Sequence, residues 1–190
     1  MEPTGKTDHD KSANLFDILA NFLENVRRLI ILGIGNELRG DDGAGVIFVR
    51  ELSRENPPEN VVLLSCGQSP ENFTGVILRE SPSHIIIVDC ADISAEPGTV
   101  SIIFENEISG IALSTHNLPL TLFLKYLRGH LPNVRILIIG IQPGVLDLGA
   151  GLSDKVRGAI DGLLKVFKGI FEMLRSSMAS SRKTSNTHVA

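Results

Sequence analysis

Five short runs rich in Ile, Leu and Val recur through the middle of the chain and alternate with segments of helical pattern. Short uninterrupted runs of such residues favour strands that are buried on both faces of a sheet. The strands are predicted at 29–34, 61–64, 84–88, 99–104 and 134–139, and the helices at 44–54, 71–79, 118–127 and 154–174. This alternation predicts an α/β fold in which helices cover both faces of a mostly parallel sheet.

The two ends of the chain differ in pattern from the middle. Residues 1–11 are polar and are predicted to be disordered, whereas apolar positions from Leu15 to Val26 recur at helical spacing. The segment 176–190 is rich in Ser and Thr, which is typical of a flexible tail. We therefore predict an N-terminal extension at 1–28 with an amphipathic helix over 12–28, one domain at 29–175, and a flexible tail at 176–190.

Composition excludes several classes of function. The net charge of −4 argues against nucleic-acid binding, which needs a concentrated basic surface. No apolar run is long enough to cross a membrane, and the polar N-terminus lacks the pattern of a signal peptide. Two cysteines in 190 residues are too few for a disulfide framework. These features predict a soluble, cytoplasmic protein without membrane insertion.

Polar residues gather where the predicted strands end. Ligands of open α/β sheets bind beyond the carboxyl ends of the strands, so these loops should converge on one site. The segments concerned are 33–43 (GIGNELRGDDG), 89–92 (DCAD), 114–119 (STHNLP) and 140–143 (GIQP).

The first of these loops has two simpler interpretations. Gly33 and Gly35 suggest a dinucleotide-binding turn, but Leu38 stands where the third glycine belongs, and two carboxylates would repel a pyrophosphate. One of Asp41 and Asp42 could instead be the N-cap of the following helix. Neither interpretation explains why further candidate ligands occur at the same edge of the predicted sheet.

Those further candidates are Asp89 and His116. Each alone is more often structural, but two carboxylates and one imidazole together can bind a first-row transition metal and leave positions open for a substrate. Cys90 is expected to be a core residue, because neighbouring side chains of a strand point to opposite faces. No Ser–His–Asp or Cys–His arrangement is evident.

Five segments of the chain resemble the hydrogenase-maturation endopeptidases, from about residue 29 to residue 167. They are GIGNELRGDDGAG, CGQSPEN, IIIVDCAD, STHNLPL and IGIQPG. The resemblance is greatest to the branch that processes the large subunit of formate-hydrogenlyase-type nickel–iron hydrogenases. It implies a three-layer α/β/α sandwich around a mixed, mostly parallel, five-stranded twisted sheet.

The resemblance also implies an activity and a ligand set. Members remove a C-terminal peptide from the hydrogenase large-subunit precursor after nickel insertion, and they read the nickel as the signal that loading is complete. Asp42, Asp89 and His116 match the ligands of that nickel and are the candidate catalytic residues. The nickel belongs to the substrate, and no organic cofactor is expected. Whether nickel polarises the scissile carbonyl or Asp42 activates water as general base stays open.

The chain departs from the family pattern in two places. Where relatives commonly have an acid before a Gly-Gly turn, this chain has Ser65-Cys66-Gly67-Gln68, and the helix over 12–28 lies outside the common pattern. We expect that helix to serve packing rather than partner binding. Candidate substrate-binding residues are Asn36, Asp41, Cys66, Gly67, Gln68, Thr115 and Asn117.

Two other functions are compatible with these residues. A metal-dependent amidase on the same scaffold would hold its metal tightly through dialysis. A non-enzymatic nickel checkpoint or delivery protein would bind the precursor without removing its C-terminal peptide.

Overall fold

Five strands form the central sheet of the computed structural model, which describes residues 8–103, 112–113 and 120–186. Their order across the sheet is β2-β1-β3-β6-β4, and all neighbours are parallel except β4, which runs antiparallel to β6. The strands are β1 (Leu29–Ile34), β2 (Val61–Gly67), β3 (His84–Asp92), β4 (Val100–Ile103) and β6 (Arg135–Ile141). A further two-residue strand, β5 (Ala112–Leu113), pairs antiparallel with the end of β3 and was not predicted.

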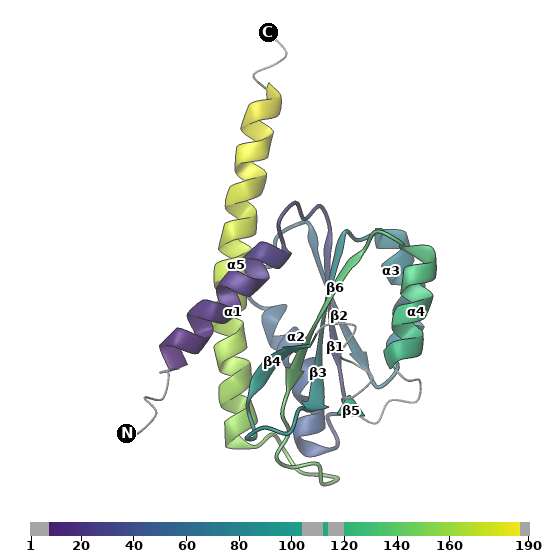
Figure 1. Ribbon diagram of the computed structural model, residues 1–190, viewed down its shortest axis with the longest axis vertical. Coiled ribbons are helices and arrows are strands. Elements are labelled where there is room, and N and C mark those ends of the chain that lie inside the picture. Colours follow the sequence, from purple (N-terminus) through teal and green to yellow (C-terminus); the bar gives the residue numbers. More distant parts are fainter. Residues whose placement is uncertain (1–7, 104–111, 114–119, 187–190) are drawn as a thin grey trace.

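Helices cover both faces of this sheet, so the predicted three-layer sandwich is confirmed (Figure 1). One layer holds α1 (Asp8–Phe22), α2 (Ala44–Leu52) and α5 (Asp154–Asn186). The other holds α3 (Thr74–Glu80) and α4 (Leu120–His130). Two short 3-10 helices, η1 (Gly40–Gly43) and η2 (Pro70–Phe73), lead into α2 and α3. None of the described helices combines the length and apolar character needed to cross a membrane.

Alternate residues of the central strands fill two separate cores. On β3, Ile86 and Val88 pack with α1, α2 and α5, whereas Ile85 and Ile87 pack with α3 and α4. All four side chains are fully buried. The unbroken aliphatic run in the sequence therefore reflects a strand covered on both sides.

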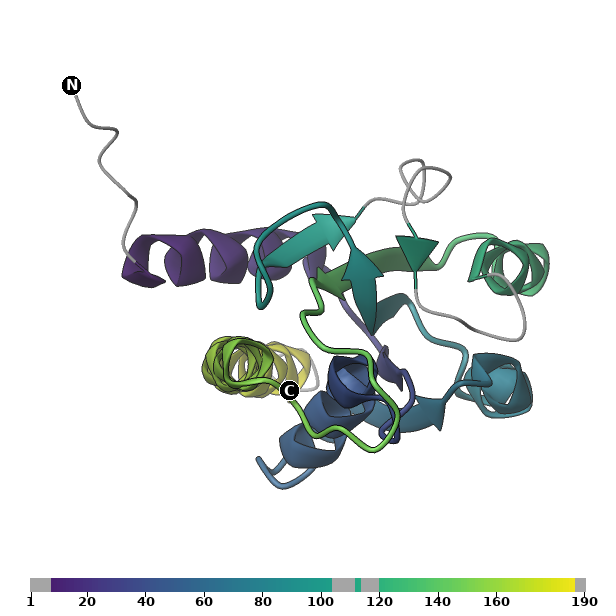
Figure 2. The ribbon, with the colours of Figure 1, turned by 90° about the horizontal axis from the view of Figure 1, so that it is seen from below.

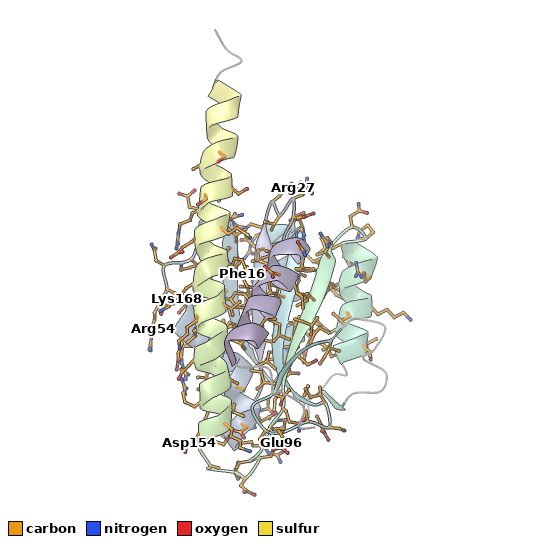
Figure 3. The ribbon with its side chains drawn as sticks, turned by 60° about the vertical axis from the view of Figure 1, so that its left-hand side comes forward. Phe16, Arg27, Arg54, Glu96, Asp154 and Lys168 are labelled. Carbon is orange, nitrogen blue, oxygen red and sulfur yellow. The ribbon has the colours of Figure 1, made fainter. Side chains whose placement is uncertain are left out.

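The C-terminal helix is longer than predicted. We expected it to end at Leu174, but α5 continues to Asn186 and extends past the rest of the molecule (Figure 3). No glycine or proline occurs between residues 170 and 186 to end the helix. The hydroxyls of Ser176 and Ser180 donate to carbonyls one turn earlier, so these polar residues are accommodated within the helix.

The N-terminal helix starts and ends earlier than predicted. It begins at Asp8 and ends at Phe22, and Asn25 adopts a left-handed φ of 61° that turns the chain toward β1. The helix packs against α5, where the ring of Phe16 lies so close to Gly169 that an added Cβ would be 3.1 Å from Cε2. Leu19 and Leu23 are buried in the same core. These contacts support a packing role for this helix.

His84 lies under the end of α1, at the start of β3. Its ring is 3% exposed and stands edge-on to Phe22 with centroids 5.2 Å apart, while Nδ1 is 2.9 Å from Ser83 Oγ. Burial, followed by the positive charge of Arg135, lowers the pKa of His84 to about 4 from 6.5, against a smaller opposing effect of the Phe22 backbone. The folded protein therefore holds this imidazole neutral.

This shift predicts a loss of stability between about pH 6.5 and pH 4. In that window the unfolded chain binds a proton at this residue that the folded protein excludes, so the free energy of unfolding falls as pH falls. Urea unfolding at pH 7 and pH 5 should show a difference that His84→Phe reduces by on the order of 1 kcal/mol. His130→Phe, at an exposed position on α4, should keep the wild-type pH dependence. Equal pH dependence in all three proteins would contradict the prediction.

Candidate active site

The loop after β1 is held against the strand ends by glycines. A Cβ at Gly45, in the first turn of α2, would lie 2.2 Å from Val88 O and 2.5 Å from Ile34 O. At Gly35, where φ is 137°, a Cβ would lie 1.8 Å from Asp42 O. That same carbonyl accepts a hydrogen bond from Asn36 N at 3.0 Å. The glycines thus allow close backbone packing, and they hold Asp42 at the carboxyl end of the central strands.

The side chain of Asp41 forms hydrogen bonds with other parts of the protein. It is fully buried, and its carboxylate accepts hydrogen bonds from the backbone amides of Gly144, Val145 and Ser153 at 2.7–2.8 Å. The hydroxyl of Ser153 adds a fourth hydrogen bond at 2.9 Å. These contacts join η1 to the loop between β6 and α5, which crosses the end of the sheet beside α2 (Figure 2). Both oxygens of this carboxylate are therefore engaged in hydrogen bonds that join the two loops.

Asp42 and Asp89 occupy the same edge of the sheet. Asp42 is 5% exposed in η1, and Asp89 is fully buried near the end of β3, which η1 contacts. Asp89 Oδ1 accepts a hydrogen bond from Cys90 N at 2.7 Å. The N-cap residues of η1 and α2 are Arg39 and Gly43, so Asp42 is the N-cap of neither helix.

The pKa of the Cys90 thiol is affected by the acids of this region. Burial raises the pKa of its thiol, and the negative charges of Asp89, Asp42 and Asp41 raise it further. The thiol is therefore protonated at neutral pH and is buried as a core residue, as the sequence predicted. Three acids therefore lie near this thiol at the same edge of the sheet.

The third predicted ligand lies outside the described residues. Thr115, His116 and Asn117 all fall within 114–119. Among the described residues, no group of three or more His, Cys, Asp or Glu side chains is arranged to hold a metal ion.

The remaining candidates, at the end of β2 and in the loop after β1, differ in their exposure. Cys66 is buried, and burial followed by the charge of Glu71 raises the pKa of its thiol to about 12. Gly67 has a φ of 60°, and its carbonyl accepts a hydrogen bond from Gly35 N, which links this turn to the β1 loop. Gln68 is exposed, whereas the side chain of Asn36 accepts a hydrogen bond from Leu38 N. Of these four residues, only Gln68 has a side chain that is both polar and exposed.

Gln142 organises the loop after β3 and was not among the predicted site residues. Its side chain is 8% exposed, and Oε1 accepts hydrogen bonds from Ile93 N at 2.8 Å and Ala95 N at 3.3 Å. Its Nε2 donates to Asp92 Oδ1 at 3.3 Å. A polar residue directly after an apolar strand was the available sequence signal, and the hydrogen bonds show a structural use for it.

Fold and site together define an α/β/α protein with two buried acids at the carboxyl ends of its central strands. The sequence model of the hydrogenase maturation protease family matches residues 46–169, and the chain belongs to this family of endopeptidases. The predicted family and enzyme class are therefore confirmed.

Sequence relatives support this assignment. A Methanocaldococcus jannaschii protein that bears the hydrogenase maturation protease name is 38% identical over 166 residues, covering 84% of this chain and 97% of the relative. The hydrogenase 3 maturation protease of Escherichia coli K12 is 28% identical over 141 residues, covering 74% of this chain and 88% of the relative.

Solved structures agree with the fold. The maturation protease HycI of Thermococcus kodakarensis superposes with a TM-score of 0.75 at 30% identity, covering 82% of this chain and 99% of that one. The maturating endopeptidase HybD of E. coli gives a TM-score of 0.64 at 27% identity, covering 79% and 93%.

Proposed function

We propose that this endopeptidase removes the C-terminal peptide of a nickel–iron hydrogenase large-subunit precursor after nickel insertion, with Asp42, Asp89 and His116 as ligands that read the substrate's nickel. The observation that carries the proposal is the convergence of two buried acids, Asp42 and Asp89, at one edge of the sheet. The relatives described above are named as hydrogenase maturation proteases, which supports a hydrogenase precursor as substrate.

The charge of the site favours a cation. Asp41 is stabilised by four hydrogen bonds within the protein, whereas Asp42 and Asp89 lie where the loops of the central strands meet. In their ionised form, the carboxylates of Asp42 and Asp89 would attract a divalent metal ion. A site with few protein ligands binds a free ion weakly, but it can complete the coordination of nickel that precursor thiolates already hold.

Chain length is compatible with a contribution from His116. Leu113 of β5 pairs with Ala91 of β3, two residues beyond Asp89. His116 follows Leu113 by three residues in the sequence, and three residues of extended chain span at most about 11 Å. This supports its inclusion as the third ligand.

The reaction adds water across one peptide bond. The oxygen of water bonds to the scissile carbonyl carbon, the C–N bond breaks, and the departing amine takes up a proton. The precursor's nickel would position the peptide, and either nickel polarises the carbonyl or Asp42 accepts the proton of water. Both cysteines are buried with raised thiol pKa values, which argues against a thiolate nucleophile.

Nickel dependence is tested by incubating the enzyme with nickel-loaded and nickel-free precursor and measuring intact masses. We expect loss of the C-terminal peptide only from the loaded form. His116→Ala should slow this cleavage at least about a hundredfold if the imidazole orients the nickel, whereas His130→Ala, at an exposed position on α4, should cleave normally. Equal processing of both precursor forms would refute nickel reading, and binding without cleavage would indicate a checkpoint protein.

A further inference from the structure

Three exposed leucines lie on two hydrogen-bonded loops, one of which leads to Asp42 of the candidate active site. Among the described residues, six large apolar side chains are exposed, and three of them lie on the two loops that Asp41 joins. Leu38 is 68% exposed in the loop before η1, and Leu146 and Leu148 are 44% and 79% exposed in the loop after β6. We call these three residues the leucine platform. The other three exposed side chains, Ile18, Leu122 and Tyr126, lie on helices.

Hydrogen bonds join the two loops that carry the leucine platform. Gly149 N donates to Leu38 O at 2.7 Å, Gly40 N donates to Ala150 O at 3.1 Å, and Arg39 Nε donates to Leu146 O at 3.4 Å. These bonds tie the backbone next to each leucine, and the buried carboxylate of Asp41 anchors both loops. The apolar side chains are therefore presented by a pre-organised surface, and a partner that binds it loses little conformational entropy in the enzyme.

The platform is continuous with the loop that carries Asp42. Three residues separate Leu38 from Asp42, and α2 begins directly after η1. The nearby acid Glu37 is paired with Arg50 of α2, with 2.6 Å between Glu37 Oε2 and Arg50 Nη1. An enzyme that cleaves a folded protein must contact that protein around the site of cleavage. An apolar, ordered surface at this place fits that contact.

We propose that the leucine platform is a docking surface for an apolar segment of the precursor polypeptide that lies next to the cleaved bond. This inference rests on the proposed function and assigns the substrate contact to three particular side chains. Their burial on binding would lower the dissociation constant and the KM of the precursor without altering the chemistry at Asp42.

The test compares Leu38→Ser, the double variant Leu146→Ser/Leu148→Ser, and Leu122→Ser, a matched control on α4 that is 51% exposed in the wild type. Cleavage of nickel-loaded precursor gives kcat and KM, and fluorescence anisotropy with labelled precursor gives the dissociation constant. Thermal unfolding and light scattering report folding and oligomeric state for each protein.

We expect both platform variants to raise KM and the dissociation constant at least about tenfold, with kcat within about twofold of wild type and unchanged unfolding temperature. The control should match the wild type. Unchanged precursor affinity in the platform variants would overturn the proposal, and so would a change confined to self-association, which would mark a contact between copies of this chain. A wild-type enzyme that binds the precursor but never cleaves it would refute the proposed function, while its affinities would still decide the platform.

Discussion

Asp42→Asn is expected to lower the rate of precursor cleavage at least about a hundredfold while the protein stays folded. The substitution keeps the shape of the side chain but removes the negative charge that a nickel ion or an activated water needs. The backbone contact of Asp42, in which its carbonyl accepts from Asn36 N, is unaffected because it does not involve the side chain. Intact mass measurements over time give the cleavage rate, and thermal unfolding gives the stability.

Two further variants sharpen this result. Asp89→Asn should produce a similar loss of rate, because Asp89 is the second proposed ligand at the same strand ends. Asp161→Asn should cleave normally, because this aspartate is exposed on α5, where it pairs with Arg157 of the same helix at 3.7 Å. Wild-type cleavage by Asp42→Asn would show that the site has been assigned to the wrong residue.

Asp41→Ala is expected to lower the stability of the fold rather than to act directly on the cleavage step. The substitution removes the acceptor of four hydrogen bonds and leaves three backbone amides and one hydroxyl to find other partners. Losing a fully buried, multiply bonded carboxylate should lower the free energy of unfolding by about 3–5 kcal/mol. Chemical denaturation of the purified variant measures this change directly.

Ser153→Ala is the matched comparison for Asp41. It removes only the hydroxyl that donates to Asp41 Oδ2 and keeps the backbone donor of the same residue. A loss of about 1 kcal/mol is expected for this variant. If Asp41→Ala cost no more than Ser153→Ala, the carboxylate would not be what holds the two loops together.

Much of the fold could be predicted because its signals are local. The aliphatic run of β3 identifies a strand buried on both faces, and the alternation of strands and helices identifies the layers. Element ends were less predictable. The tail after Leu174 is rich in Ser, yet α5 continues to Asn186 because nothing in that stretch interrupts the helical backbone. The two-residue strand β5 is too short to leave a pattern and depends on its pairing with β3.

The exposure of the three platform leucines could not be predicted from the sequence either. Leu38, Leu146 and Leu148 look like ordinary apolar residues in the sequence, and only the tertiary structure leaves them exposed on two loops that are hydrogen-bonded to each other. Gln142 is the converse case, because its polar side chain follows a strand but is buried by the loop that it organises.

The sequence by itself determined the alternating architecture and the family, and it predicted a site where polar loops follow the strand ends. It could not distinguish the roles of Asp41 and Asp42, which are neighbours of the same residue type with equal claims to cap a helix or bind a ligand. The tertiary structure decided between them, because the loop of residues 143–153 surrounds Asp41 with four donors and Asp42 receives none of those hydrogen bonds. These donors lie more than 100 positions away along the chain, so no local pattern could have predicted which carboxylate they would bind.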